Sequence, residues 1–294
     1  MNEPRRTPSR ARPWLRLAAA AACAVTLAAC SPGAPVAGGP GAAGSGGGVS
    51  AGASAASAAA SPAPSGTPVV EISCPTPPDA FVNRAPGEGK TVALTFDDGP
   101  APADAAILDV LREEGVKATF FVTGEHAQAD PETVRRMVAE GHLIAGHSWE
   151  HRYPKEVSGG WSIDYLTGQL DRTHALLTEL TGQTICYFRP PGGNKDNVLA
   201  ASAAAGITSV MWNVDSEDWQ QPGRTTAAAT KLIVSQATAS PGTHPVVLLH
   251  SGKASHEPDT RYSPYRGNTV AALPTIIDWY RAEGYTFVRL DAAD

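Results

Sequence analysis

The chain has 294 residues, a formal net charge of −6 and only 6% aromatic residues, and this length allows one or two domains. Residues 31–70 carry no charged side chain and consist almost entirely of Gly, Ala, Ser and Pro. Such a segment cannot bury enough apolar surface to offset the entropy lost on ordering, so residues 30–70 are predicted to form a disordered tether. The roughly 220 residues that follow are enough for one sizeable core. They contain no block of basic residues, which argues against a nucleic acid as partner.

The N-terminus has the pattern of an export signal. Five Arg residues within the first sixteen positions precede an apolar stretch, Leu17–Ala29, that is too short to span a bilayer. The end of this stretch, Leu27–Cys30, resembles a bacterial lipobox, which implies cleavage after residue 29 and lipidation of Cys30. We therefore expect a lipoprotein signal peptide at 1–29 and a mature protein that works outside the cytoplasm, anchored to the membrane by its lipid. Ordinary secretion after cleavage is the alternative.

The remaining cysteines form a pair. Cys23 leaves with the signal peptide and Cys30 takes the lipid, so that Cys74 and Cys186 remain. An even number of cysteines in an oxidising compartment favours a disulfide. This bond would fasten an N-terminal arm, residues 71–89, to a strand in the middle of the domain. Two unrelated buried thiols are the alternative.

From residue 90 onward, short apolar runs alternate with helical patterns, and glycines follow the predicted helix ends. This alternation implies parallel strands with right-handed crossovers. Seven strands predict an incomplete (β/α)7 barrel, a TIM-like α/β fold, for a single domain at 90–294. An open doubly wound sheet is the alternative. The expected strands are Thr91–Phe96, Ala118–Val122, Leu143–Ala145, Ile185–Phe188, Thr208–Asn213, Val246–His250 and Thr286–Leu290, and the expected helices lie at about 103–114, 131–140, 162–180, 196–205, 225–238 and 269–283.

Ionisable side chains follow five of the predicted strands at their C-terminal ends. Barrel enzymes build their active sites at this end of the strands, because the loops there converge. A purely structural role would scatter such residues over both rims of the barrel. The residues in question are Asp97, Asp98, His147, His151, Arg189, Asp215, Asp218 and His250.

The spacing of His147 and His151 is that of a metal-ligand pair. On one turn of a helix, residues four apart face the same way, so that both imidazoles reach one ion. With a carboxylate from Asp97 or Asp98 they would form a three-ligand site that leaves a position open for water, as in catalytic zinc sites. A capped or surface histidine pair is the alternative. Calcium fits less well, because it prefers clustered oxygen donors.

Taken in order, these residues resemble the five sequence motifs of the polysaccharide deacetylases, the NodB-homology domain of carbohydrate esterase family four. The resemblance runs from about residue 90 to residue 290, and all five motifs occur in the family's order. The matching segments are Thr95–Pro100, His147–His151, Arg189–Gly193, Asp215–Trp219 and Leu248–His250.

The resemblance implies a role for each matching residue. Asp98, His147 and His151 would hold one divalent metal ion, with Zn²⁺ expected and Co²⁺, Ni²⁺ or Mn²⁺ as alternatives. Asp97 would be the general base and His250 the general acid. Arg189 would pair with Asp97, and Asp218 would orient the general acid. Trp219 would form an apolar wall, and Gly192 would bind the oxyanion through its backbone N–H.

The third motif departs from the family pattern. An aromatic residue, usually Tyr, is common where this chain has Gly192, so one wall of the sugar groove is expected to lack a ring. Trp149, Trp161 and Trp212 are further candidates for lining that groove, with core packing as the alternative.

These implications define the expected function. The protein is predicted to be a metal-dependent hydrolase that removes N-acetyl groups from a cell-wall or chitin-like polysaccharide, with peptidoglycan N-acetylglucosamine favoured. An acetylxylan-type O-acetyl esterase and an inactive, glycan-binding wall lipoprotein are the alternatives. We expect a monomer that binds no nucleic acid and touches the membrane only through its lipid.

Overall fold

A computed structural model describes residues 74–221, 225–258 and 265–292 of the chain. These residues belong to one compact unit, residues 62–294. The predicted signal peptide, Cys30 and the predicted tether lie outside the described residues.

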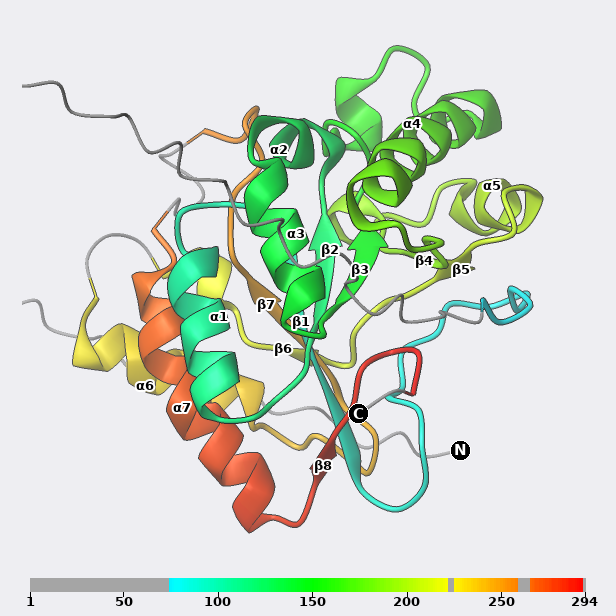
Figure 1. The fold of residues 1–294 in the computed structure, drawn as a ribbon. Helices are drawn as coiled ribbons and strands as arrows, with labels where there is room; N and C mark the ends of the chain where they lie inside the picture. The colour runs from blue at the N-terminus through cyan, green and yellow to red at the C-terminus, as the bar shows by residue number, and fades with distance from the viewer. Residues whose placement is uncertain (1–73, 222–224, 259–264, 293–294) are drawn as a thin grey trace, which may run out of the picture. The chain divides into compact units, whose positions relative to one another are not determined.

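The described part of the chain is built around a parallel sheet in the order β5-β4-β3-β2-β1-β7-β6, with β8 paired to the start of β1 (Figure 1). All strand pairs are parallel, as the alternation of strands and helices predicts. The expected incomplete (β/α)7 barrel is confirmed. The strands are β1 (Thr91–Gly99), β2 (Thr119–Val122), β3 (Leu143–Gly146), β4 (Tyr187–Phe188), β5 (Thr208–Ser209), β6 (Val214–Asp215), β7 (Val246–His250) and β8 (Thr286–Phe287).

The strand predicted at Thr208–Asn213 starts at the predicted residue but is shorter than predicted. Only Thr208–Ser209 form β5, and the residues after it connect β5 to β6, which occupy opposite ends of the strand order. The backbone changes partners along the way, because Val210 N–H donates to the Phe188 carbonyl, whereas Asn213 N–H donates to the Val246 carbonyl. The barrel is therefore incomplete between β5 and β6, where the chain bridges the gap without a ladder of hydrogen bonds between the two strands.

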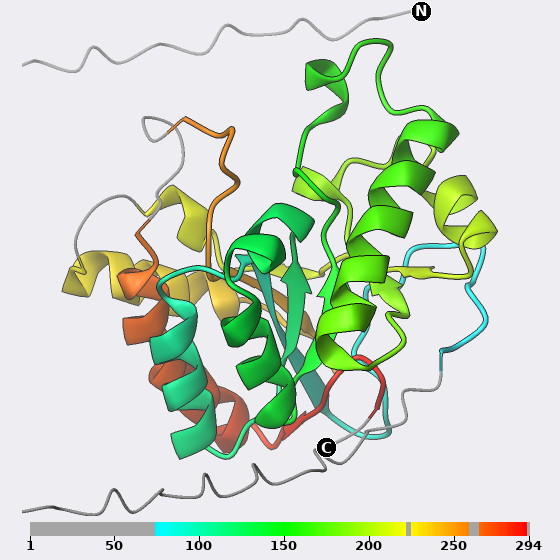
Figure 2. The ribbon, with the colours of Figure 1, turned by 45° about the horizontal axis from the view of Figure 1, so that its top comes forward.

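Helices cover the outside of the sheet in the same order as the strands that they follow (Figure 2). Neighbouring helices pack in the sequence α6, α7, α1, α3, α4 and α5. The helices are α1 (Asp104–Glu113), α2 (Gly124–Ala129), α3 (Pro131–Ala139), α4 (Ile163–Thr181), α5 (Val198–Ala204), α6 (Ala227–Ala237) and α7 (Gly267–Ala282), with short 3₁₀ turns η1 (Pro154–Glu156), η2 (Pro191–Gly193) and η3 (Asp218–Gln220).

The two faces of β1 divide the hydrophobic core. Val92, Leu94 and Phe96 pack outward into the cluster formed with the helices, whereas Ala93 belongs to the cluster inside the barrel. Successive side chains of a strand point to opposite faces. Asp97 therefore continues the inward-facing series at the C-terminal end of β1.

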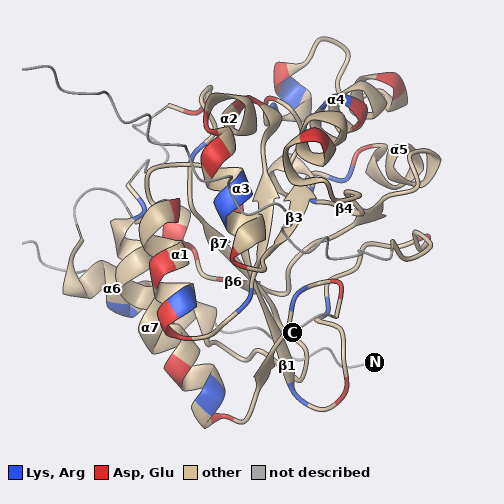
Figure 3. Ribbon diagram, viewed as in Figure 1, with Lys and Arg blue, Asp and Glu red and all other residues tan. Residues whose placement is uncertain are grey.

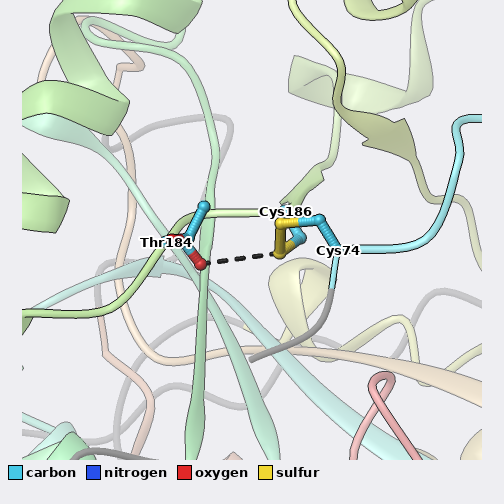
Figure 4. Close-up of a disulfide and its surroundings, with 3 residues drawn as sticks. All are labelled: Cys74, Thr184 and Cys186. Carbon is cyan, nitrogen blue, oxygen red and sulfur yellow. Dashed lines mark hydrogen bonds between the residues drawn. A yellow bond between two sulfur atoms is a disulfide. The ribbon is translucent and has the colours of Figure 1, made fainter. Parts of the chain in front are cut away.

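A disulfide fastens the N-terminal arm to the barrel (Figure 4). Cys74 is bonded to Cys186, and their Cα atoms lie 5.0 Å apart. Further along the arm, Val82 N–H donates to the Ser209 carbonyl, and the Val82 carbonyl accepts a hydrogen bond from Met211 N–H. The arm is thus attached beside β4 and β5, as the pairing of the two cysteines implies.

Both acidic and basic residues lie on the neighbouring helices α1 and α3 (Figure 3). Arg136 of α3 donates to Asp109 of α1 at 2.7 Å and to Glu140 at 2.6 Å, and so ties the two helices together. Among the described residues, none of the helices combines the length and the apolar character needed to cross a membrane.

Candidate active site

A cavity of about 470 Å³ opens at the C-terminal ends of the strands. Asp97, Asp98 and His250 line it from β1 and β7, and His147 and His151 line it from the loop that follows β3. Gly192, predicted to supply an oxyanion-binding N–H, and Trp219, predicted as an apolar wall, also line it. Arg189 and Asp218 lie behind this layer and are buried. The fold therefore brings together around one cavity the residues that the five sequence motifs supply.

A bulge in β1 brings two consecutive aspartates into the same cavity. In a regular strand their side chains would point to opposite faces. Here the register between β1 and β2 shifts between Asp97 and Gly99, and Asp98 has a φ of 69°. The extra residue turns the chain locally, so that both carboxylates line the cavity.

The histidine pair lies in a tight loop and not on the turn of helix that its spacing predicted. Ser148 and His151 have φ angles of 63° and 54°, in the left-handed region that a helix does not use. The Ser148 hydroxyl accepts a hydrogen bond from His151 N–H at 3.0 Å, which closes the turn. The prediction that both imidazoles reach one point holds, but it is the loop that places them there.

Three ligand atoms form a triangle of the size that a metal ion needs. Asp98 Oδ1 lies 3.4 Å from His147 Nε2 and 3.4 Å from His151 Nε2, too far for hydrogen bonds. Two donors bound to a tetrahedral zinc ion at about 2.0–2.1 Å are themselves about 3.4 Å apart. Asp98 Oδ1 is buried and has no hydrogen-bond partner in the described residues. The donor set and its spacing therefore fit a divalent ion.

The hydrogen bonds of the triad also suit metal binding. His147 donates from Nδ1 to the Arg189 carbonyl at 2.7 Å, so that in the neutral imidazole Nε2 is free and directed at Asp98. Burial opposes the charged form of His147, but the Asp97 and Asp98 carboxylates raise its pKa, so that a metal ion takes the place of a proton there. Burial lowers the pKa of His151 to about 3, so that this imidazole is neutral. Burial alone would raise the pKa of Asp98, but the neighbouring histidines, His151 first, hold it well below its ordinary value.

Asp97 is held by a guanidinium inside the barrel. Arg189 is fully buried and donates from Nη1 to Asp97 Oδ1 at 2.7 Å and to the Thr95 hydroxyl at 2.9 Å. Its guanidinium stacks on the ring of Phe121, 4.0 Å from the ring centroid. The other oxygen of Asp97 lies 3.6 Å from His147 Nε2 and thus faces the metal triangle. Asp97 therefore stays outside the ligand set yet within reach of a molecule bound there.

His250 forms the opposite side of the cavity and is paired with a buried carboxylate. Its Nδ1 donates to Asp218 Oδ1 at 2.7 Å, and its backbone N–H donates to Asp218 Oδ2 at 2.9 Å. The Thr269 hydroxyl adds a third hydrogen bond to Asp218, at 2.7 Å. Burial opposes the charged form of His250, but the Asp218 carboxylate raises its pKa to about 9. His250 is therefore protonated at neutral pH and exposes Nε2–H towards the cavity.

A tyrosine fills the space where Gly192 lacks a side chain. Gly192 has a φ of 59°, and a Cβ atom there would lie 2.6 Å from Cε1 of Tyr153. The sequence-based prediction missed Tyr153, although it stands only two positions after His151. Of the three tryptophans considered for the groove, Trp212 lines the cavity, whereas Trp149 and Trp161 are buried.

Glu257 is a second residue that sequence reasoning missed. It lies in the loop after β7 and lines the cavity, where its Oε1 accepts a hydrogen bond from the Tyr153 hydroxyl at 2.5 Å. The two residues are 104 positions apart. No local pattern could indicate this contact, because it exists only once the loop has folded over the cavity.

Comparison with known proteins gives consistent matches. Residues 84–210 match the protein-family model described as polysaccharide deacetylase. A chitooligosaccharide deacetylase of Sinorhizobium fredii is 36% identical over 206 residues, which cover 69% of this chain and 92% of that protein. A peptidoglycan-N-acetylglucosamine deacetylase of Bacillus cereus is 33% identical over 217 residues, which cover 72% and 92% of the two chains.

The fold has a similar counterpart among solved structures. The crystal structure of the Bc1960 peptidoglycan N-acetylglucosamine deacetylase, in complex with 4-naphthalen-1-yl-N-oxidanyl-benzamide, superposes with a TM-score of 0.61 at 31% identity. The match covers 72% of this chain and 91% of that one.

Proposed function

The chain belongs to the polysaccharide deacetylase family, and from this premise we propose that it hydrolyses the N-acetyl amide of peptidoglycan N-acetylglucosamine. The observation that carries the proposal is the arrangement of three functional units around one cavity. A metal-binding triangle (Asp98, His147 and His151) lies between a carboxylate held by Arg189 and an imidazolium held by Asp218. Amide hydrolysis needs these three: activation of the carbonyl, a base for water and an acid for the leaving amine.

The metal is proposed to be Zn²⁺, with Co²⁺, Ni²⁺ and Mn²⁺ as candidates that a site of two histidines and one carboxylate also accepts. When bound, such an ion supplies Lewis acidity that polarises the amide carbonyl and lowers the pKa of water. Asp98, His147 and His151 would hold it, and the Arg189 carbonyl keeps the neutral His147 in the tautomer that can bind.

Asp97 is proposed as the general base. Its Oδ1 is bound to Arg189, which keeps the carboxylate oriented, and Oδ2 is left to take a proton from the attacking water. Backbone N–H groups stabilise developing oxyanions in such sites. We propose that Gly192, on the wall of the cavity, supplies one.

His250 is proposed as the general acid. Expulsion of an amine requires that its nitrogen be protonated as the C–N bond breaks. His250 holds this proton at neutral pH because Asp218 stabilises the imidazolium, and the hydrogen bond from Nδ1 directs Nε2–H to the cavity.

The walls of the cavity suit a sugar. Trp219, Trp212 and Tyr153 present aromatic surface around the metal triangle, and such rings pack against the apolar face of a pyranose. Tyr153 supports the proposal in particular. Its ring occupies the space beside Gly192, where the family's third motif commonly supplies an aromatic side chain and this chain does not.

Acetate release tests the proposal. The purified protein is incubated with peptidoglycan, with chitin oligomers and with acetylxylan, each with and without a chelator, and its metal content is measured beside the assay. Release from peptidoglycan that disappears with the chelator supports the proposal. Release from chitin oligomers alone, or from acetylxylan alone, would mean that this polysaccharide and not peptidoglycan is the substrate. No release from any of them, by protein that contains metal, would favour a glycan-binding lipoprotein without activity.

The cellular location of the protein is proposed from the sequence alone. Export, cleavage before Cys30 and its lipidation would place a monomeric catalytic domain on a tether outside the membrane, in reach of the cell wall. Metabolic labelling with a fatty acid tests this, because the label should be lost in Cys30→Ala. Sedimentation of the purified protein tests the monomer.

A further inference from the structure

One nitrogen of the metal triangle has no hydrogen-bond partner. His151 is buried, and its Nδ1 makes no hydrogen bond within the described residues. Its other nitrogen, Nε2, faces Asp98 and belongs to the triangle. An imidazole that binds a metal through Nε2 while neutral carries its proton on Nδ1. Burying that N–H without an acceptor costs about 1–3 kcal/mol, so the metal-bound state of His151 calls for an acceptor.

Glu257 offers one. Its carboxylate is buried, and Oε1 lies 4.0 Å from His151 Nδ1. This separation is too long for a hydrogen bond and is closed by a shift of about 1 Å. Polar contacts at catalytic sites are often long without ligand and shorten when the site is filled.

Hydrogen bonds of the described residues around Glu257 hold its carboxylate close to His151. The Tyr153 hydroxyl donates to Oε1 at 2.5 Å. Lys253 donates from its ammonium to the carbonyls of Ala254 and Glu257, and Arg266 donates to the Gly252 carbonyl at 2.8 Å. The contact between Glu257 and His151 thus joins two anchored segments and not two mobile side chains.

We infer that Glu257 is a positioning residue of the metal site: its carboxylate accepts a hydrogen bond from His151 Nδ1–H and orients that imidazole for the metal. A carboxylate in this place makes a histidine a stronger ligand, and loss of such a partner lowers metal affinity by about 10–100-fold. The inference rests on the proposed function only for the existence of the metal site.

His256 is the competing partner. It lies beside His151, with ring centroids 5.9 Å apart, and the two histidines and Glu257 form a group that is itself compact enough to hold an ion. The Nε2 atom of His256 lies 3.0 Å from Oε2 of a different carboxylate, however, that of Glu156. The experiment must therefore separate three cases: Glu257 as acceptor, His256 as acceptor, and a second ion between them.

Zinc affinity of the metal-free protein tests the inference without reference to catalysis. Zn²⁺ is titrated against a chromophoric chelator in the wild type, Glu257→Ala, Glu257→Gln and His256→Ala. Glu125→Gln is the matched control, because Glu125 touches the same loop through Ser255 without facing His151. We expect one Zn²⁺ per chain, a dissociation constant raised about 10–100-fold in Glu257→Ala, partial recovery in Glu257→Gln, which keeps an acceptor, and no change in the control.

A spectroscopic signature distinguishes positioning from general support of the loop. In zinc-loaded protein labelled with ¹⁵N-histidine, the Nδ1–H proton of His151 should exchange slowly with water, and this signal should be absent from Glu257→Ala. Unchanged zinc affinity in folded Glu257→Ala would overturn the inference. So would a loss confined to His256→Ala, or two Zn²⁺ per wild-type chain. Failure of the proposed function would instead appear as wild-type protein that binds zinc and releases no acetate.

Discussion

Replacing Asp218 by Asn is expected to lower the pKa of His250 and with it the pH at which activity declines. The two side chains are joined by a 2.7 Å hydrogen bond, and the Asp218 side chain is fully buried. Burial favours neutral His250, yet the Asp218 carboxylate raises its pKa to about 9, against an ordinary value of 6.5. The difference corresponds to about 3 kcal/mol in favour of the imidazolium.

The sign of the pH dependence follows from the raised pKa. The stabilisation is complete below pH 6.5, where His250 is charged in the folded and the unfolded chain, and it is lost as the pH rises through about 9. In Asp218→Asn the acid loses its proton at lower pH. If the pKa returns to about 6.5, the protonated fraction at pH 8 falls about thirtyfold, and the proposed general-acid step falls with it.

Two measurements check this prediction. The pKa of His250 is measured in metal-free protein by NMR, with His250→Gln to assign the signal, and the pH profile of acetate release is recorded for the metal-loaded enzyme. Thr269→Val is the control, because it removes a hydrogen bond to Asp218 but keeps the charge. We expect a shift of the alkaline limb to lower pH in Asp218→Asn and little shift in the control. A His250 pKa that stays near 9 in Asp218→Asn would refute the reasoning.

Three further changes have expected outcomes. Asp97→Asn should lower turnover by about 10²–10⁴-fold, the usual contribution of a general base, while the metal content measured by atomic absorption stays intact. Gly192→Ala should destabilise the fold by about 1–3 kcal/mol in urea titrations, since it combines a left-handed φ with a clash against Tyr153; removing the Tyr153 ring at the same time should recover part of this. Replacing Cys74 and Cys186 by Ser opens a link across 112 positions and should lower the free energy of unfolding by up to about 4–5 kcal/mol.

Each of these has an outcome that contradicts it. Loss of metal in Asp97→Asn would mean that the two aspartates exchange roles. Additive destabilisation in the double variant of Gly192 and Tyr153 would mean that the two sites do not interact. Equal stability of the oxidised and the reduced wild type would mean that the disulfide contributes nothing.

Patterns within short windows of the chain sufficed for the fold class and for most of the site. The alternation of apolar runs with helical segments predicts a parallel sheet, because strand and helix periodicities are local. The order of the five motifs likewise predicts, through the family resemblance, that Asp98, His147 and His151 are the metal ligands. The same windows gave the wrong end for the strand at Thr208–Asn213, whose residues after Ser209 connect two strands, because tertiary pairing decides where a strand ends.

What the sequence by itself determined is therefore which residue types stand at the ends of which strands. The tertiary structure alone decided how they meet: the bulge that turns Asp98 into the cavity, the left-handed turn that aims His151, the Tyr153 ring over Gly192, and Glu257 behind the metal site. The reason is physical. Motif spacing is written into neighbouring residues, whereas contacts between loops far apart in the chain arise only when the barrel has brought the ends of its strands together.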